Sequence, residues 1–158
     1  MNDKPYNSVE FAKYIAAFWN EQGVDINMTK VQKLLYIAYG TWLVVYDKRL
    51  LDEYPQAWPY GPVFPTTRNK LLKLELKNIT KNDVSSELQD NKDLEKLIKA
   101  IHNSYFGSWN ASQLSAWSHK EGSAWADTVA TPGFEWGQII PDNLTKKWFA
   151  AFVNNGSN

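Results

Sequence analysis

The chain has 158 residues, a length at which a single domain buries roughly 70% of the surface that its unfolded form exposes. Its 17 basic and 17 acidic residues cancel, which excludes a field strong enough to attract nucleic acid or an anionic membrane without specific contacts. The absence of cysteine excludes disulfides, thiolate nucleophiles and cysteine-ligated metal sites, and it suits a reducing compartment.

The N-terminal third predicts two helices. Asn7 offers an N-cap for a helix over residues 8–22, where apolar side chains recur at helical spacing. Asn27 can cap a second helix over about residues 28–47, which is apolar nearly all round, as central helices usually are. Its apolar stretch is too short to span a bilayer. The residues that interrupt this stretch are Gln32, Lys33 and Gly40.

The sequence changes character over residues 49–65. Several prolines and Gly61 break any helix there, and residues 56–58 are long enough only for a brief strand. We therefore expect an ordered, rigid loop with a short strand or hairpin near residues 50–60. The prolines are Pro55, Pro59, Pro62 and Pro65.

Two further helices are predicted in the middle of the chain. The first covers residues 66–77, with four leucines to anchor it, and the polar residues 85–91 are expected to form an exposed connection. In the second, apolar residues follow helical spacing over 94–105, and Gly107 is placed to end it. The anchoring leucines are Leu71, Leu72, Leu74 and Leu76.

The C-terminal third predicts two more helices and a loop between them. Asn110 or Ser112 can cap a short helix that ends near His119. A loop over residues 131–141 follows, and Asp142 can cap the last helix. The large apolar residues of the loop are Phe134, Trp136, Ile139 and Ile140.

These elements together predict a mainly α fold, a compact single-domain helical bundle around the central helix. We expect one domain over residues 1–158 without a linker, and a frayed tail over residues 154–158. The N-terminal segment lacks the basic start, apolar run and cleavage site of a signal peptide, so we expect a cytoplasmic protein.

The sequence carries no motif for a metal, a cofactor or a nucleophile. Neither His102 nor His119 has a second histidine or a carboxylate at a spacing typical of zinc sites, and glycine-rich phosphate loops and GxSxG are missing. We therefore expect neither a cofactor nor catalysis. One alternative stays open, a small enzyme that uses His119 as a general base beside Tyr60 or Ser118, and it requires a concave pocket.

A second alternative is a nucleic-acid-binding regulator. Arg68 precedes three lysines on one side of the predicted helix, and these side chains could contact phosphates. A solvated face is the expectation, because Glu75 interrupts the series and the whole chain is neutral. The lysines are Lys70, Lys73 and Lys77.

The segment from Ala57 to Pro65 is the least ordinary stretch of the chain. Its prolines fix φ and Gly61 permits a turn, so Trp58 and Tyr60 stand on a stiff support that loses little entropy on binding. One interpretation is a structural corner with Trp58 and Val63 buried. The other is a pre-organised aromatic surface for a protein partner. A single rigid loop can serve both purposes.

His119 and Trp125 form a second candidate for recognition. An imidazole and an indole six residues apart can present their N–H groups together. The alternative is a histidine at a helix end, stabilised by the helix dipole when charged, beside a packing indole.

Two segments resemble the Panacea domain of SocA-like antitoxins and phage-associated proteins. Residues 31–40, VQKLLYIAYG, are similar to the family's LQKLLY helix, and residues 57–63, AWPYGPV, are similar to its AWxYGPV loop. Weaker similarity continues at Leu114 and Ser115, at Ser118 and His119, and at Trp125.

The resemblance implies a mostly helical antitoxin that neutralises a toxin protein, encoded by the adjacent gene, through direct contact. Some relatives are associated with delivery of a toxin to an ATP-dependent protease, which implies an adaptor role as a variant. We do not expect nucleic acid or a membrane as partner. The residues expected at the partner-binding surface are Trp58, Tyr60, Gly61, Pro62, Val63, His119 and Trp125.

Overall fold

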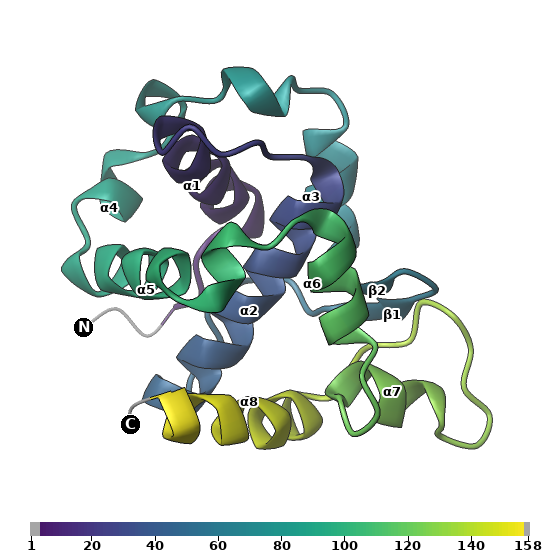
Figure 1. Cartoon of the computed structure of the whole chain (residues 1–158). Coiled ribbons are helices and arrows are strands. Elements are labelled where there is room, and N and C mark those ends of the chain that lie inside the picture. Colours follow the sequence, from purple (N-terminus) through teal and green to yellow (C-terminus); the bar gives the residue numbers. More distant parts are fainter. Residues whose placement is uncertain (1–3, 157–158) are drawn as a thin grey trace.

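The computed structural model describes residues 4–156, with side chains described as far as Val153. It confirms the mainly α class, because helices pack around the central helix α2 (Met28–Tyr46) on several sides (Figure 1). The largest neighbouring helices are α1 (Ser8–Glu21), α5 (Lys92–Asn103), α6 (Ala111–Ser118) and α8 (Asp142–Gly156).

Asparagine side chains start three of these helices as predicted. Asn7 accepts a hydrogen bond from the backbone N–H of Glu10 at 3.0 Å, and Asn27 accepts one from Lys30 at 2.9 Å. Asn110 does the same for α6 within a reciprocal capping box. Each bond satisfies a backbone donor that the first turn of a helix leaves without a partner. A further helix, α7 (Ala124–Val129), was not predicted and begins after Ser123.

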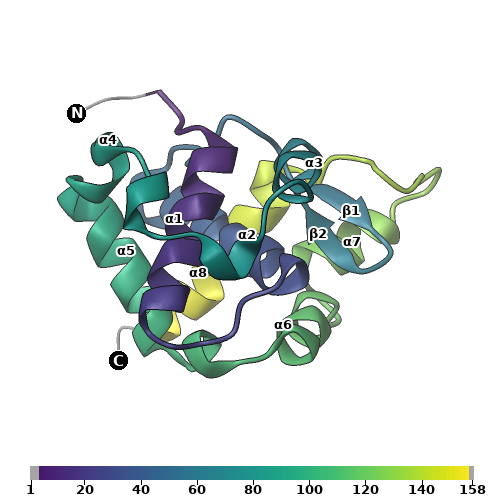
Figure 2. The same cartoon turned by 90° about the horizontal axis from the view of Figure 1, so that it is seen from above.

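The expected hairpin consists of β1 (Gln56–Trp58) and β2 (Gly61–Val63). The strands are antiparallel, with Ala57 opposite Pro62. A third segment extends this layer, since the N–H of Ala57 donates to the carbonyl of Gln138 at 2.8 Å. The hairpin, α7 and the loop 131–141 thus share one end of the molecule (Figure 2).

The helix predicted over residues 66–77 is shorter than expected. Helix α3 (Pro65–Leu71) begins at a proline, which suits the first helical position, and it ends six residues before Lys77. The prediction that all four leucines anchor it was wrong, because Leu72 and Leu74 are exposed. Since Lys73 and Lys77 lie beyond the helix, the four basic residues share no helical face. A 3₁₀ turn, η1 (Leu76–Asn78), follows.

The segment 85–91 is more than an exposed connection. It contains the short helix α4 (Ser86–Gln89), whose Leu88 is buried, and a 3₁₀ turn, η2 (Lys81–Asp83), precedes it. Helix α5 ends before the predicted Gly107, which lies in a third 3₁₀ turn, η3 (Tyr105–Ser108).

Helix α8 differs from its prediction at both ends. The carbonyl of Pro141 accepts the N–H of Thr145 at 3.2 Å, so Asp142 is the first helical residue and not the cap. Its carboxylate instead accepts the hydroxyl of Tyr39 at 2.6 Å. At its other end α8 continues to Gly156, into the tail that is predicted to fray over residues 154–158, and residues 157 and 158 lie outside the described residues.

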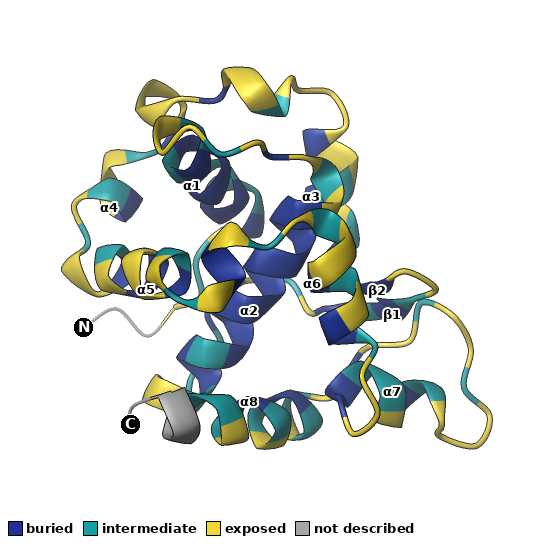
Figure 3. Ribbon diagram, viewed as in Figure 1, coloured by how far each residue is buried: buried dark blue, intermediate teal, exposed yellow. Residues whose placement is uncertain are grey.

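Burial concentrates on α2 and on the faces that surround it (Figure 3). Gly40 illustrates how close α8 approaches, because a Cβ atom there would lie 2.3 Å from a ring carbon of Phe149. Over residues 4–156, none of the helices combines the length and the apolar character needed to cross a membrane. The largest fully buried side chains include Trp19, Tyr36, Tyr39, Phe64, Trp117 and Phe149.

Candidate partner-binding surface

Gln32 and Lys33, two polar residues in the apolar helix α2, hold the hairpin by hydrogen bonds. The amide oxygen of Gln32 accepts the backbone N–H of Phe64 at 2.8 Å, and its amide nitrogen donates to the carbonyl of the same residue at 3.3 Å. The ammonium of Lys33 donates to the carbonyl of Pro62 at 3.3 Å. Two side chains of α2 therefore bond the inner side of β2 and of the residue that follows it, where a neighbouring strand would otherwise pair.

Lys33 is an unusual residue for a helix interior, because its side chain is almost fully buried. Removal from water disfavours the charged ammonium and lowers the pKa of Lys33 to about 8. The stem of the side chain lies against the hairpin, and its head satisfies a buried carbonyl. Lys33 therefore fixes the position of β2.

Gly61 sits where the hairpin touches both α2 and α6. Its φ of +113° is a conformation that side chains with a Cβ atom rarely adopt. A Cβ atom there would also lie 2.7 Å from the hydroxyl oxygen of Ser118 and 2.9 Å from Cε of Lys33. Only glycine allows this turn and this contact together.

His119 and Trp125 hold the tip of the hairpin from its other side. The His119 ring lies against the Trp125 indole with centroids 4.3 Å apart and the ring planes tilted by 35°, and it hydrogen-bonds to the backbone of Tyr60. The indole N–H of Trp125 donates to the carbonyl of Trp58 at 2.8 Å. Both candidate recognition residues thus bond the hairpin backbone.

The electrostatics of His119 follow from this position. Its Nε2 atom is buried and has no hydrogen-bond partner among the described residues. Burial lowers the pKa of His119, the charge of Lys33 lowers it further, and the bond to the Tyr60 backbone acts in the opposite direction. The neutral imidazole is therefore the form that fits this site at pH 7.

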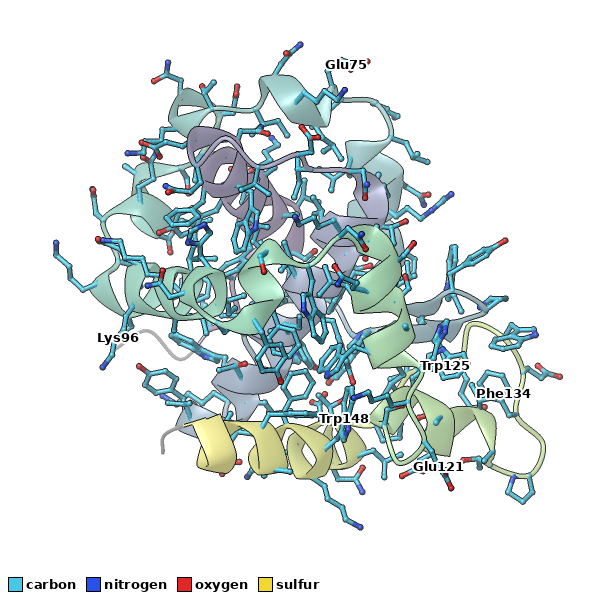
Figure 4. All side chains as sticks on the ribbon, viewed as in Figure 1. Glu75, Lys96, Glu121, Trp125, Phe134 and Trp148 are labelled. Atoms are coloured by element: carbon cyan, nitrogen blue, oxygen red, sulfur yellow. The ribbon has the colours of Figure 1, made fainter. Side chains whose placement is uncertain are left out.

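Aromatic and aliphatic side chains remain exposed beside this scaffold. Tyr60 is 75% exposed, Trp136 56% and Ile139 46%. Trp58 and Trp125 are partly buried, and Trp136 lies 6.3 Å from Trp125 with the ring planes at 29°. In Figure 4, Trp125 projects at the hairpin end of the molecule. We call Trp58, Tyr60, Trp125, Trp136 and Ile139 the aromatic surface.

The structure brings the seven sequence-predicted residues together and divides them by role. Gly61, Pro62 and Val63 are buried and form the support. Tyr60 is open to a partner, and Trp58 is only partly buried, with the guanidinium of Arg68 over its ring at 5.5 Å. The structural interpretation of the loop is therefore confirmed for Val63 and only in part for Trp58, and the partner-binding interpretation stays a prediction.

Four residues of this site were not predicted. Trp136 and Ile139 stand in the loop 131–141, and the only signal was their apolar character between Gly133 and Pro141. Gln32 and Lys33 carried a clearer signal, since polar side chains inside an apolar helix need buried partners.

The geometry gives little support to His119 as a general base. The hydroxyl of Ser118 donates to the carbonyl of Ser115 at 2.8 Å and not to the imidazole. Tyr60 meets His119 through its backbone, while its side chain is exposed. Within the described residues, no group of three or more histidine, aspartate or glutamate side chains could hold a metal ion.

Comparison with known proteins shows which family the chain resembles. The family model of the antitoxin SocA-like, Panacea domain matches residues 31–126, which include the helix and the hairpin that meet at Gln32 and Lys33. Antitoxin SocA from Caulobacter vibrioides is 30% identical over 124 residues, which is 72% of this chain and 65% of that protein. The chain thus spans less than two thirds of this relative's length, and no solved structure gives a significant match. The chain belongs to the SocA-like antitoxin family that is defined by the Panacea domain.

Proposed function

We propose that this protein is a cytoplasmic antitoxin that neutralises a toxin protein by direct contact through the aromatic surface. The observation that carries the proposal is the exposure of Tyr60 and Trp136 beside a hairpin that α2, α6 and α7 hold in place. Tyrosine and tryptophan dominate the energetics of protein interfaces, and a rigid support limits the entropy lost on binding. Family membership supports the class of partner.

The route of neutralisation can be direct masking or delivery of the toxin to an ATP-dependent protease. Masking is the proposal, because the exposed rings offer an interface that requires no third protein. In masking, the amount of toxin in the cell stays constant while its activity falls. In delivery, the toxin itself disappears unless the protease is absent.

Co-expression with the product of the adjacent gene tests the function. We expect this product to be toxic alone, harmless beside the wild-type chain, and present at unchanged level. A product that is harmless alone, or that stays toxic beside this chain, contradicts the antitoxin role. Loss of the toxin from the cell contradicts masking and favours delivery.

A further inference from the structure

His119 is the point at which three parts of the site meet. Its ring lies against Trp125 of α7, its hydrogen bond reaches the backbone of Tyr60 at the hairpin tip, and its Nε2 atom faces the hairpin at Gly61. A Cβ atom on Gly61 would be 3.3 Å from this Nε2 atom and 2.9 Å from Cε of Lys33. The imidazole and the lysine therefore approach the same point of the backbone.

Protonation of His119 conflicts with this packing. A protonated imidazole carries an N–H on both ring nitrogens, and the buried Nε2 atom has no acceptor among the described residues. The new charge would also lie beside the buried ammonium of Lys33, and a buried donor without an acceptor is costly. The ring, the hairpin tip or both must move before Nε2 can reach water.

We propose that His119 is a positioning residue whose neutral ring holds the aromatic surface in its binding conformation, and whose protonation releases the bound toxin. The inference rests on the proposed function and adds a means of regulating the same surface. Tyr60 and Trp125 would respond together, because both contact the one ring that changes its charge.

The groups around the ring act on its protonation in different directions. Lys33 of α2 is the charged residue that acts on it from another element, and it lowers the pKa of His119. Lys120 and Glu121 follow His119 in the turn to α7, and both are exposed, so solvent screens their charges. Tyr60 contributes its backbone, which acts in the opposite direction to Lys33.

The first test uses the free protein and needs no toxin. An NMR titration from pH 8 to pH 5 would follow the imidazole of His119 together with the indole N–H of Trp125 and the amide of Gly61. The proposal predicts that all three signals shift with one midpoint, which lies below the ordinary histidine value of 6.5. The other histidine, His102, packs against Phe18 and Trp19 and not against Trp125, so its signal provides an internal control. If the indole signal of Trp125 does not shift while His119 titrates, the proposal is overturned.

The second test measures binding of the co-expressed toxin against pH. If binding requires the neutral ring, the dissociation constant rises up to about tenfold for each pH unit below the midpoint of His119, since one proton is released on binding. A His119→Gln variant cannot take up this proton and should bind with a flat pH profile. An equally steep profile in His119→Gln overturns the proposal. If the three NMR signals shift together but the chain binds no toxin, the proposed function is rejected. The coupling between His119 and the hairpin then still stands.

Discussion

The side-chain amide of Gln32 pairs with both backbone groups of Phe64, as a neighbouring strand would. This pair joins the two segments that carry the family resemblance, the apolar helix and the proline-rich hairpin. Lys33 adds a bond to Pro62 next to it. The two segments are therefore one structural unit, in which the helix supplies the partners that the short hairpin lacks.

Substitution of Gln32 by leucine should destabilise the fold. Both the N–H and the carbonyl of Phe64 would stay buried without partners, and the expected loss is about 2–4 kcal/mol in the free energy of unfolding. Urea denaturation measures it, with Gln22→Leu as control because Gln22 is exposed at the end of α1. Equal, small losses in the two variants would show that the amide bonds contribute nothing.

Gly40→Ala should destabilise the contact between α2 and α8. The added methyl group would lie 2.3 Å from the ring of Phe149, and overpacking of this kind costs about 1–3 kcal/mol. A double-mutant cycle with Phe149→Leu checks the cause. The smaller side chain should absorb part of the added methyl group, so the two losses should be less than additive. If the losses of the two single variants add strictly, the strain caused by Gly40→Ala does not arise from its contact with Phe149.

The burial of Lys33 predicts that stability rises with pH above neutrality. The pKa of Lys33 is about 8 in the folded protein and 10.5 for an exposed lysine, so between these values the unfolded chain binds more protons. The free energy of unfolding should therefore increase from pH 8 to pH 9.5. Lys33→Met should remove most of this increase, and Lys30, whose pKa is also lowered by burial, should account for the rest.

The pH range of this measurement must stop at about pH 9.5, because burial also raises the pKa values of Tyr36 and Tyr39. Above about pH 10 these residues ionise more readily in the unfolded chain than in the folded one, which destabilises the fold. A curve that is as steep in Lys33→Met as in the wild type would assign the effect to other groups.

The sequence predicted the elements whose signals are local. Asn7, Asn27 and Asn110 mark helix starts through side-chain bonds that span three residues, and the central helix followed from its apolar character. Partners that come from far along the chain could not be predicted from such local signals. Helix α3 is capped by the carboxylate of Glu53, which accepts the N–H of Thr67 at 3.1 Å from 14 residues away.

In the candidate site, too, local features could be predicted and distant contacts could not. The positions of proline, glycine and aromatic residues predicted a stiff, aromatic segment over residues 57–65. Local sequence could not tell that Tyr60 points outward while Val63 is buried, because that depends on the contacts of β2 with α2. Trp136 joins the surface only because residues 138–140 pair with the hairpin.

The affinity of purified variants for the toxin tests whether the aromatic surface is the binding site. Tyr60→Ala and Trp136→Ala remove the two most exposed rings of the aromatic surface, and Leu72→Ala removes a side chain that is 57% exposed on another part of the molecule. We expect an affinity loss of about thirtyfold or more for each ring variant, with an unchanged melting temperature, since truncation of a hot-spot residue costs about 2 kcal/mol or more. Leu72→Ala should bind as the wild type does. Ring variants that bind as tightly as Leu72→Ala would show that the toxin binds elsewhere.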